Sequence, residues 1–218
     1  MKINILKLSL ILISGFLYAQ DAQISDSFNP NQWNKLFVEK GMSIVDESLL
    51  YTTKNYIKAK VPSYNISIPM RYNALSDDME YVNDKDELFS LHKRNGLLVE
   101  YLDGRQFLFT NYDIQGVKNE GFLEVVSSLD ETIRIYKRTK IHKIEVDKNP
   151  YNDNSNVSFS KETKYLITAN DKIIEVPNNV NKFEKETNYK ISEFVKQNKI
   201  NLKKEDDLKK LAKFLNKS

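Results

Sequence analysis

Residues 68–82 read Ile-Pro-Met-Arg-Tyr-Asn-Ala-Leu-Ser-Asp-Asp-Met-Glu-Tyr-Val, and residues 97–109 read Leu-Leu-Val-Glu-Tyr-Leu-Asp-Gly-Arg-Gln-Phe-Leu-Phe. Apolar and aromatic residues recur at every second position, for example at 97, 99 and 101 and again at 107 and 109. A period of two is typical of a half-buried strand. Asp103-Gly104 predicts a hairpin with a type I′ turn. We therefore expect an antiparallel meander of about four strands between Ile68 and Tyr112.

The rest of the chain extends this pattern and then changes it. Further strands are expected at 122–126, at 132–141, and on either side of Asn170-Asp171, where a compact hairpin ends at Pro177. Helical spacing then begins, in one group at Ile191, Phe194 and Val195, and in a second at Leu208, Leu211, Ala212 and Leu215. The sequence predicts an α+β fold, an antiparallel, strongly curved or barrel-like β-meander followed by two C-terminal amphipathic helices within about 179–216.

Residues 1–19 have the pattern of a secretory signal peptide. Lys2 and Lys7 precede an apolar run over residues 8–17, which is shorter than the roughly 20 residues that span a bilayer. Ala19 fits the position before the cleavage site, and an uncleaved membrane anchor is the alternative. We expect one β-rich domain over 20–218. The chain has no Cys, so it has no disulfides and no lipid anchor through an N-terminal Cys.

Without residues 1–19 the chain has 31 basic and 30 acidic residues. Such a balance gives no reason to expect nucleic acid as a partner. No second apolar run is long enough to cross a membrane. The tail differs from this average, because residues 182–217 hold 11 Lys and 6 acidic residues. Either these lysines form the solvated face of helices packed on the sheet, or they form a patch for anionic lipid or polysaccharide.

Catalytic and cofactor motifs are absent from the sequence. Without Cys there is no thiol nucleophile and no thiolate metal site. His92 and His142, the two histidines, are on different expected strands and belong to no metal-binding spacing. The chain has neither a Gly-x-Ser-x-Gly motif nor a glycine-rich phosphate loop. We therefore expect no cofactor and no metal.

The acidic run from Asp77 to Glu87 is the strongest chemical candidate in the sequence. Asp78 and Glu80 are at i and i+2 of one expected strand and so share a face. Two such carboxylates could act as the acid and base of a glycosidase or as calcium ligands, although the EF-hand pattern is not met. The alternative is the polar outer face of a surface hairpin.

The same region supplies the candidates for ligand binding. Arg71 could hold an anion, or could form a salt bridge to an acidic residue of a neighbouring strand. Tyr72 and Tyr81 are candidates because Tyr serves both as a strand residue and as a platform for carbohydrate. The spread of the 12 Tyr along the chain favours a structural role for most of them.

The segment Met70-Arg-Tyr-Asn-Ala-Leu-Ser-Asp-Asp-Met-Glu-Tyr-Val resembles a segment of small exported proteins of Bacteroidetes-type bacteria. Their C-terminal end is similar to residues 191–199 and 205–216, and their leader is similar to Tyr18-Ala-Gln. The resemblance implies export and a β-rich body with a helical tail. It implies no activity and supplies no catalytic residues.

Together these observations favour an exported, non-enzymatic protein with a binding or structural role, either in the cell envelope (the periplasm or the outer envelope) or secreted. Its expected partner is a protein, glycan or lipid of the envelope. The alternative is a hydrolase of an extracellular polymer that uses Asp78 and Glu80. A shared cleft around these two carboxylates would favour the hydrolase.

Overall fold

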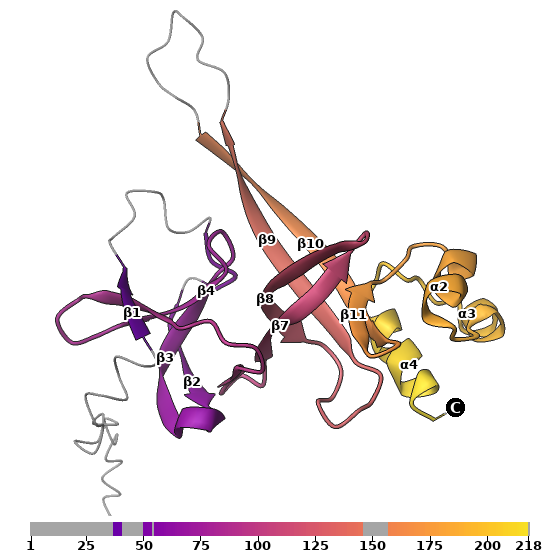
Figure 1. Cartoon of the computed structure of the whole chain (residues 1–218), viewed down its shortest axis with the longest axis horizontal. Coiled ribbons are helices and arrows are strands. Elements are labelled where there is room, and N and C mark those ends of the chain that lie inside the picture. The colour runs from indigo at the N-terminus through magenta and orange to yellow at the C-terminus, as the bar shows by residue number, and fades with distance from the viewer. Residues whose placement is uncertain (1–36, 41–49, 54, 146–156, 218) are drawn as a thin grey trace, which may run out of the picture.

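The structure is a computed structural model, and it describes residues 37–40, 50–53, 55–145 and 157–217 (Figure 1). The predicted leader over residues 1–19 lies outside the described residues. The strands are β1 (Phe37–Lys40), β2 (Ile57–Val61), β3 (Ile66–Asn73), β4 (Asp78–Val82), β5 (Leu88–Leu91), β6 (Leu98–Tyr101), β7 (Gln106–Ile114), β8 (Val117–Val125), β9 (Ile135–Glu145), β10 (Val157–Ala169) and β11 (Lys172–Glu175). The helices are a 3₁₀ turn at Pro62–Tyr64, α2 (Val180–Thr187), α3 (Ser192–Asn198) and α4 (Glu205–Leu215).

The described strands form one sheet in the order β1-β5-β4-β3-β2-β6-β7-β11-β10-β9-β8, and β8 also pairs with β7. This last pairing closes the five strands β7 to β11 into a barrel, while β1 to β6 extend from it as a curved sheet. Each strand from β6 to β11 pairs antiparallel with the next, as a meander requires. The predicted α+β fold with a barrel-like meander is confirmed. In the strand order, β6 departs from a simple meander because it pairs with β2 and not with β5.

The ring of five strands also depends on the pairing of β7 with β11. This pairing is parallel and has a single register pair, Ile174 with Asp113. The antiparallel pairing of β9 with β10, by comparison, has eleven register pairs. The β7–β11 seam is therefore the shortest link in the barrel wall.

Two of the expected hairpins use different turns. At Asn170-Asp171 both φ angles are positive, 50° and 60°, as a type I′ turn requires. At Asp103-Gly104 only Gly104 has a positive φ, of 89°, and Tyr101 N–H donates to Arg105 O at 2.8 Å across a three-residue loop. The type I′ prediction for Asp103-Gly104 is therefore wrong, because Leu102 joins the loop and Gly104 alone takes the left-handed conformation.

The alternation along β7 separates two apolar cores. Phe107 and Phe109 face the core of the extended sheet, together with Met70 and Met79. Leu108 and Tyr112 belong to a smaller cluster within the barrel strands. A third cluster joins the barrel to the helices, with Ile135, Ile167, Phe183, Leu208 and Leu211 among its members. Consecutive side chains at the start of β7 therefore face different apolar clusters.

Three helices follow the barrel, one more than expected. The two predicted helices correspond to α3 and α4, and α4 buries Leu208, Leu211, Ala212 and Leu215 as the spacing predicts. The additional helix α2 begins after Asn179, whose side chain accepts hydrogen bonds from the N–H groups of Asn181 and Lys182. None of the described helices has the length and apolar composition needed to cross a bilayer.

The turn between β3 and β4 connects the extended sheet to the barrel through Asp77. This residue has a φ of 58°, and its carboxylate accepts a hydrogen bond from Tyr72 Oη at 2.6 Å. The N–H of Phe122, on barrel strand β8, lies 3.2 Å from both carboxylate oxygens. Nearby, Ile141 N–H of β9 donates to Ala74 O at 2.9 Å. Burial raises the pKa of Asp77 above 3.8, against the opposing effect of these hydrogen bonds.

This raised pKa predicts a pH-dependent difference in stability between the wild-type protein and Asp77→Asn. The folded state holds the Asp77 proton more tightly than the unfolded state, so the contribution of Asp77 is greatest below pH 3.8 and is lost as pH rises through its folded pKa. The amide oxygen of Asn can still accept from Tyr72 and Phe122. We expect the free energy of unfolding of Asp77→Asn, relative to wild type, to rise from acid to neutral pH. Urea unfolding of both proteins across this range measures the difference, and a constant difference would contradict the assignment.

Candidate functional site

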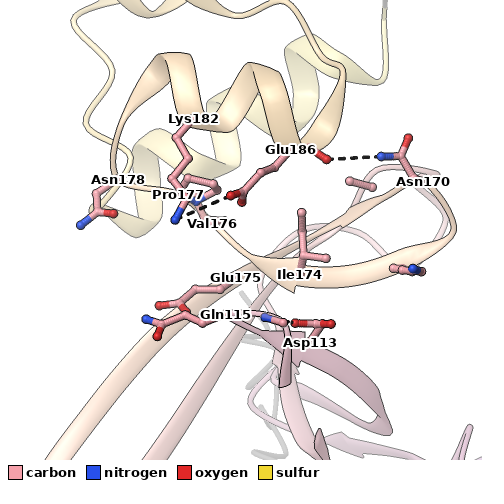
Figure 2. A pocket seen from close by; sticks show the side chains of 13 residues that line it. Asp113, Gln115, Asn170, Ile174, Glu175, Val176, Pro177, Asn178, Lys182 and Glu186 are labelled. Atoms are coloured by element: carbon pink, nitrogen blue, oxygen red, sulfur yellow. Dashed lines mark hydrogen bonds and ion pairs between the residues drawn. The ribbon is translucent and has the colours of Figure 1, made fainter. Parts of the chain in front are cut away.

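A cavity of about 660 Å³ lies beside the β7–β11 seam, between the barrel and helix α2 (Figure 2). Its walls come from three parts of the chain: the end of β7 with the turn that follows it, strand β11 with its flanking residues, and α2. The lining residues are Asp113, Gln115, Gly116, Ala169, Asn170, Lys172, Ile174, Glu175, Val176, Pro177, Asn178, Lys182 and Glu186. Cavities of this volume accommodate small organic ligands.

Local hydrogen bonds hold the barrel side of the cavity. Gln115 and Gly116 both have positive φ angles, 53° and 82°, in the tight turn between β7 and β8. Gly116 N–H donates to Asp113 Oδ1 at 2.7 Å, which holds the Asp113 carboxylate at the end of β7. On the neighbouring hairpin, Asn170 Nδ2 donates to Glu186 O at 3.3 Å and links the β10–β11 turn to α2.

Helix α2 supplies the opposite wall. Phe183 is fully buried in the cluster between barrel and helices, and this burial anchors the helix. Lys182 and Glu186 are one helical turn apart, both exposed, and their charged ends form an ion pair of 3.6 Å. Figure 2 shows both side chains extending from α2 toward the cavity. The apolar residues of the lining are Ala169, Ile174, Val176 and Pro177.

Glu175 is the least satisfied polar group of the lining. Its Oε1 lies 3.5 Å from Lys164 Nζ. Its Oε2 is buried and accepts no hydrogen bond from any described residue. A buried acceptor without a donor costs about 1–3 kcal/mol.

A second cavity, of about 580 Å³, lies near the same seam. It shares Asp113 and Lys172 with the first cavity and is otherwise lined by Asn95, Thr110, Asn111, Tyr112, Lys118, Asn119, Asp171 and Ile173. Polar residues therefore surround the seam on both sides. The seam joins two strands that are far apart in sequence, so this arrangement depends on barrel closure.

The predicted carboxylate pair, Asp78 and Glu80, lies on one face of β4 as expected, and both residues are buried. Glu80 accepts hydrogen bonds from Tyr51 Oη at 2.7 Å and Asn73 Nδ2 at 2.9 Å, and its Oε2 is 3.7 Å from Arg71 Nε. Asp78 Oδ1 forms an ion pair of 3.0 Å with Lys93. Each carboxylate is thus paired with a separate cation.

The three predicted ligand-binding residues divide between the two faces of the same sheet. Arg71 is opposite Glu80 in the register, and its guanidinium stacks over the Tyr51 ring at 3.6 Å from the ring centre. Tyr72 and Tyr81 point the other way, into the apolar core, and both are nearly inaccessible. Burial raises the pKa of Tyr81, and burial together with Asp77 raises that of Tyr72. The salt-bridge alternative for Arg71 agrees with this geometry.

Neither histidine belongs to a group of three possible metal ligands among the described residues. His142 Nε2 lies 3.3 Å from Glu162 Oε2 on the exposed face of β9 and β10. His92 follows β5 in the extended sheet. Within the described ranges, no three His, Asp or Glu side chains converge into a metal-binding group.

The sequence analysis did not identify the cavity residues. The available signals were the Asn170-Asp171 turn, which indicates one edge of the cavity, and the Pro177-Asn-Asn run before α2. Neither signal indicates that Asp113 and Glu175 line the same cavity. Asp113 pairs with Ile174, which is 61 positions later in the sequence, and only the fold brings these two strands together.

Comparison of the chain with protein-family models, with curated proteins and with solved structures finds no match. The resemblance to exported proteins of Bacteroidetes-type bacteria therefore stays a prediction.

Proposed function

We propose that this chain is an exported, non-enzymatic binding protein of the cell envelope or the extracellular space, and that the cavity between α2 and β11 takes a sugar. The observation that carries the proposal is the lining itself, which combines carboxylates, amides and amines with four apolar residues. Export rests on the predicted leader and on the family resemblance.

The chemistry of the lining fits a polyhydroxylated ligand. A sugar hydroxyl both donates and accepts hydrogen bonds. Asp113, Glu175 and Glu186 offer acceptors, while Gln115 and Asn178 offer amide donors. The apolar residues among the lining, such as Ile174 and Pro177, offer contacts for the C–H groups of a sugar ring.

The environment of Asp78 and Glu80 supports binding over hydrolysis. A glycosidase needs two carboxylates that face the scissile bond, one as acid and one as base or nucleophile. Here Glu80 is 1 % exposed and surrounded by Arg71, Tyr51 and Asn73, and Asp78 is paired with Lys93. These contacts explain both carboxylates as parts of the sheet.

The binding test uses a glycan array followed by calorimetry with the sugars that bind. We expect Glu175→Gln to weaken binding roughly tenfold, because it replaces a charged hydrogen-bond acceptor with a neutral amide. Asn178→Ala, at an exposed position, serves as a second variant should Glu175→Gln fold poorly.

The matched control is Glu120→Gln, which makes the same chemical change at an exposed residue of β8 outside both cavities. It should bind as wild type does. If no sugar binds, or if the cavity variants and the control bind equally well, the proposed site is wrong. Hydrolysis of a bound glycan that Asp78→Asn abolishes would establish the hydrolase instead.

A further inference from the structure

The charge of the protein is divided unevenly between its β-rich body and its helical tail. Residues 182–217 hold 11 Lys and 6 acidic residues, whereas residues 20–181 hold 20 basic and 24 acidic residues. The tail is thus net positive by five charges and the body net negative by four. Figure 1 shows the helices gathered on the side of the barrel away from the extended sheet.

The positive charge is densest where α3 ends and α4 begins. Residues 194–204 contain four lysines and no acidic residue. We call Lys196, Lys199, Lys203 and Lys204 the lysine patch. All four are exposed, and none forms an ion pair with a described residue. By contrast, Lys182, Lys209 and Lys210 of the neighbouring helices are each paired with a carboxylate.

The backbone under the lysine patch is well anchored. Ile200 and Leu202 alternate with the lysines and are buried in the cluster between barrel and helices. Ile200 N–H donates to Val195 O at 3.0 Å, and Lys204 N–H donates to Asn201 O at 3.0 Å. This connection therefore presents its lysines outward from a fixed backbone.

The apolar faces of the helices are already used. Leu208, Leu211 and Leu215 are buried, and the Phe194 and Phe214 rings stack on each other at 4.1 Å. None of the strongly exposed large apolar side chains of the described residues lies on a helix. Contact through this surface would therefore be electrostatic and peripheral, without insertion of a helix into an apolar phase.

The identity of the cations indicates the kind of partner. All the basic residues between 182 and 217 are Lys, and none is Arg. Arg is favoured where planar groups of a defined ligand are held by paired hydrogen bonds, whereas Lys acts as a mobile point charge. A diffuse anionic surface suits Lys, and each Lys close to such a surface contributes on the order of 1 kcal/mol.

We propose that the lysine patch docks this protein on a membrane surface rich in anionic phospholipid headgroups. The proposal is independent of the cavity, which lies between α2 and β11.

The test measures how much protein sediments with vesicles. One set is phosphatidylcholine with roughly 30 % phosphatidylglycerol, which imitates a strongly anionic leaflet, and the other set is phosphatidylcholine alone. The protein is used as purified from its cells, with its N-terminus determined. The patch variant changes Lys196, Lys199, Lys203 and Lys204 to Gln. The control variant changes Lys58, Lys60, Lys140 and Lys161, four exposed lysines of the body, to Gln. Both variants lose the same charge.

We expect the wild-type protein to bind the anionic vesicles and to be released as NaCl rises from about 50 to 300 mM, where screening becomes short-ranged. The patch variant should bind on the order of tenfold or more weakly, and the control variant within about threefold of wild type. Equal loss in both variants would mean that net charge alone acts, and would overturn the proposal. If the wild-type protein does not bind the anionic vesicles, the proposal is also overturned. Binding of the lysine patch to heparin beads would then assign this surface to an anionic polysaccharide.

Discussion

Replacing Gly121 with alanine is expected to lower the free energy of unfolding by about 2–4 kcal/mol. A Cβ at this position would overlap Asp77 Oδ2 and would lie 3.3 Å from Asp77 Cγ and 3.4 Å from Tyr112 Oη. The carboxylate is held by Tyr72 Oη and by the N–H of Phe122, so it can move only by giving up these bonds. The methyl group therefore disrupts the connection between the extended sheet and the barrel. Urea denaturation of the two proteins measures the loss.

A double-mutant cycle identifies the cause of this loss. In an Asp77→Ala background the overlapping oxygen is absent, so adding Gly121→Ala should cost less than about 1 kcal/mol. A loss of the same size in both backgrounds would mean that the strand backbone, and not Asp77, excludes the methyl group. If Gly121→Ala alone leaves stability within about 0.5 kcal/mol of wild type, the turn does not hold Asp77 as described.

Glu80→Ala is expected to destabilise the protein by about 3–5 kcal/mol, because it removes a buried carboxylate that lies 3.7 Å from Arg71 Nε and accepts hydrogen bonds from two neighbouring side chains. Arg71 is 6 % exposed and Glu80 1 % exposed, and the two residues are opposite each other in the β3–β4 register. Tyr51 Oη and Asn73 Nδ2 also lose their acceptor when the carboxylate is removed. The measurement is the midpoint and slope of urea unfolding, with Glu120→Ala as the exposed control.

A second variant shows whether the loss of stability in Glu80→Ala comes from the lost charge or from the lost packing. Arg71→Met combined with Glu80→Leu removes both charges and keeps apolar volume, so it should be more stable than Glu80→Ala alone. If the double variant is less stable than Glu80→Ala, the hydrogen bonds around Arg71 and Glu80 stabilise the fold more than apolar packing can. A stable, folded Glu80→Ala that loses hydrolytic activity would return Glu80 to a catalytic role.

The predictable part of this fold is the part governed by local alternation and spacing. Residues 97, 99, 101, 107 and 109 are buried in the structure because one face of each strand packs on an apolar core. The α4 spacing holds for the same reason on a helix. Asn170-Asp171 forms its turn because both residues tolerate a positive φ.

The remaining features depend on contacts between distant segments. The pairing of β6 with β2, and not with the adjacent β5, follows from the layout of the whole sheet. Asp77 gave no signal that separated it from Asp78, although one is hydrogen-bonded to barrel strand β8 and the other pairs with Lys93. The acidic run is a catalytic candidate in the sequence because its carboxylates can be read there. The cations and hydrogen-bond donors that pair with them come from other parts of the chain and cannot.

The single register pair between β7 and β11 has a consequence for how this protein folds. β7 is complete at residue 114, but its partner across the seam begins only at Lys172, so the ring of strands cannot be completed until most of the chain is available. Closure of a long loop is an entropic cost that contacts repay late, which makes the seam a late event in folding and an early site of opening. A ligand held by residues of both strands would bind the closed ring and not the open one, so occupancy and ring closure would stabilise each other.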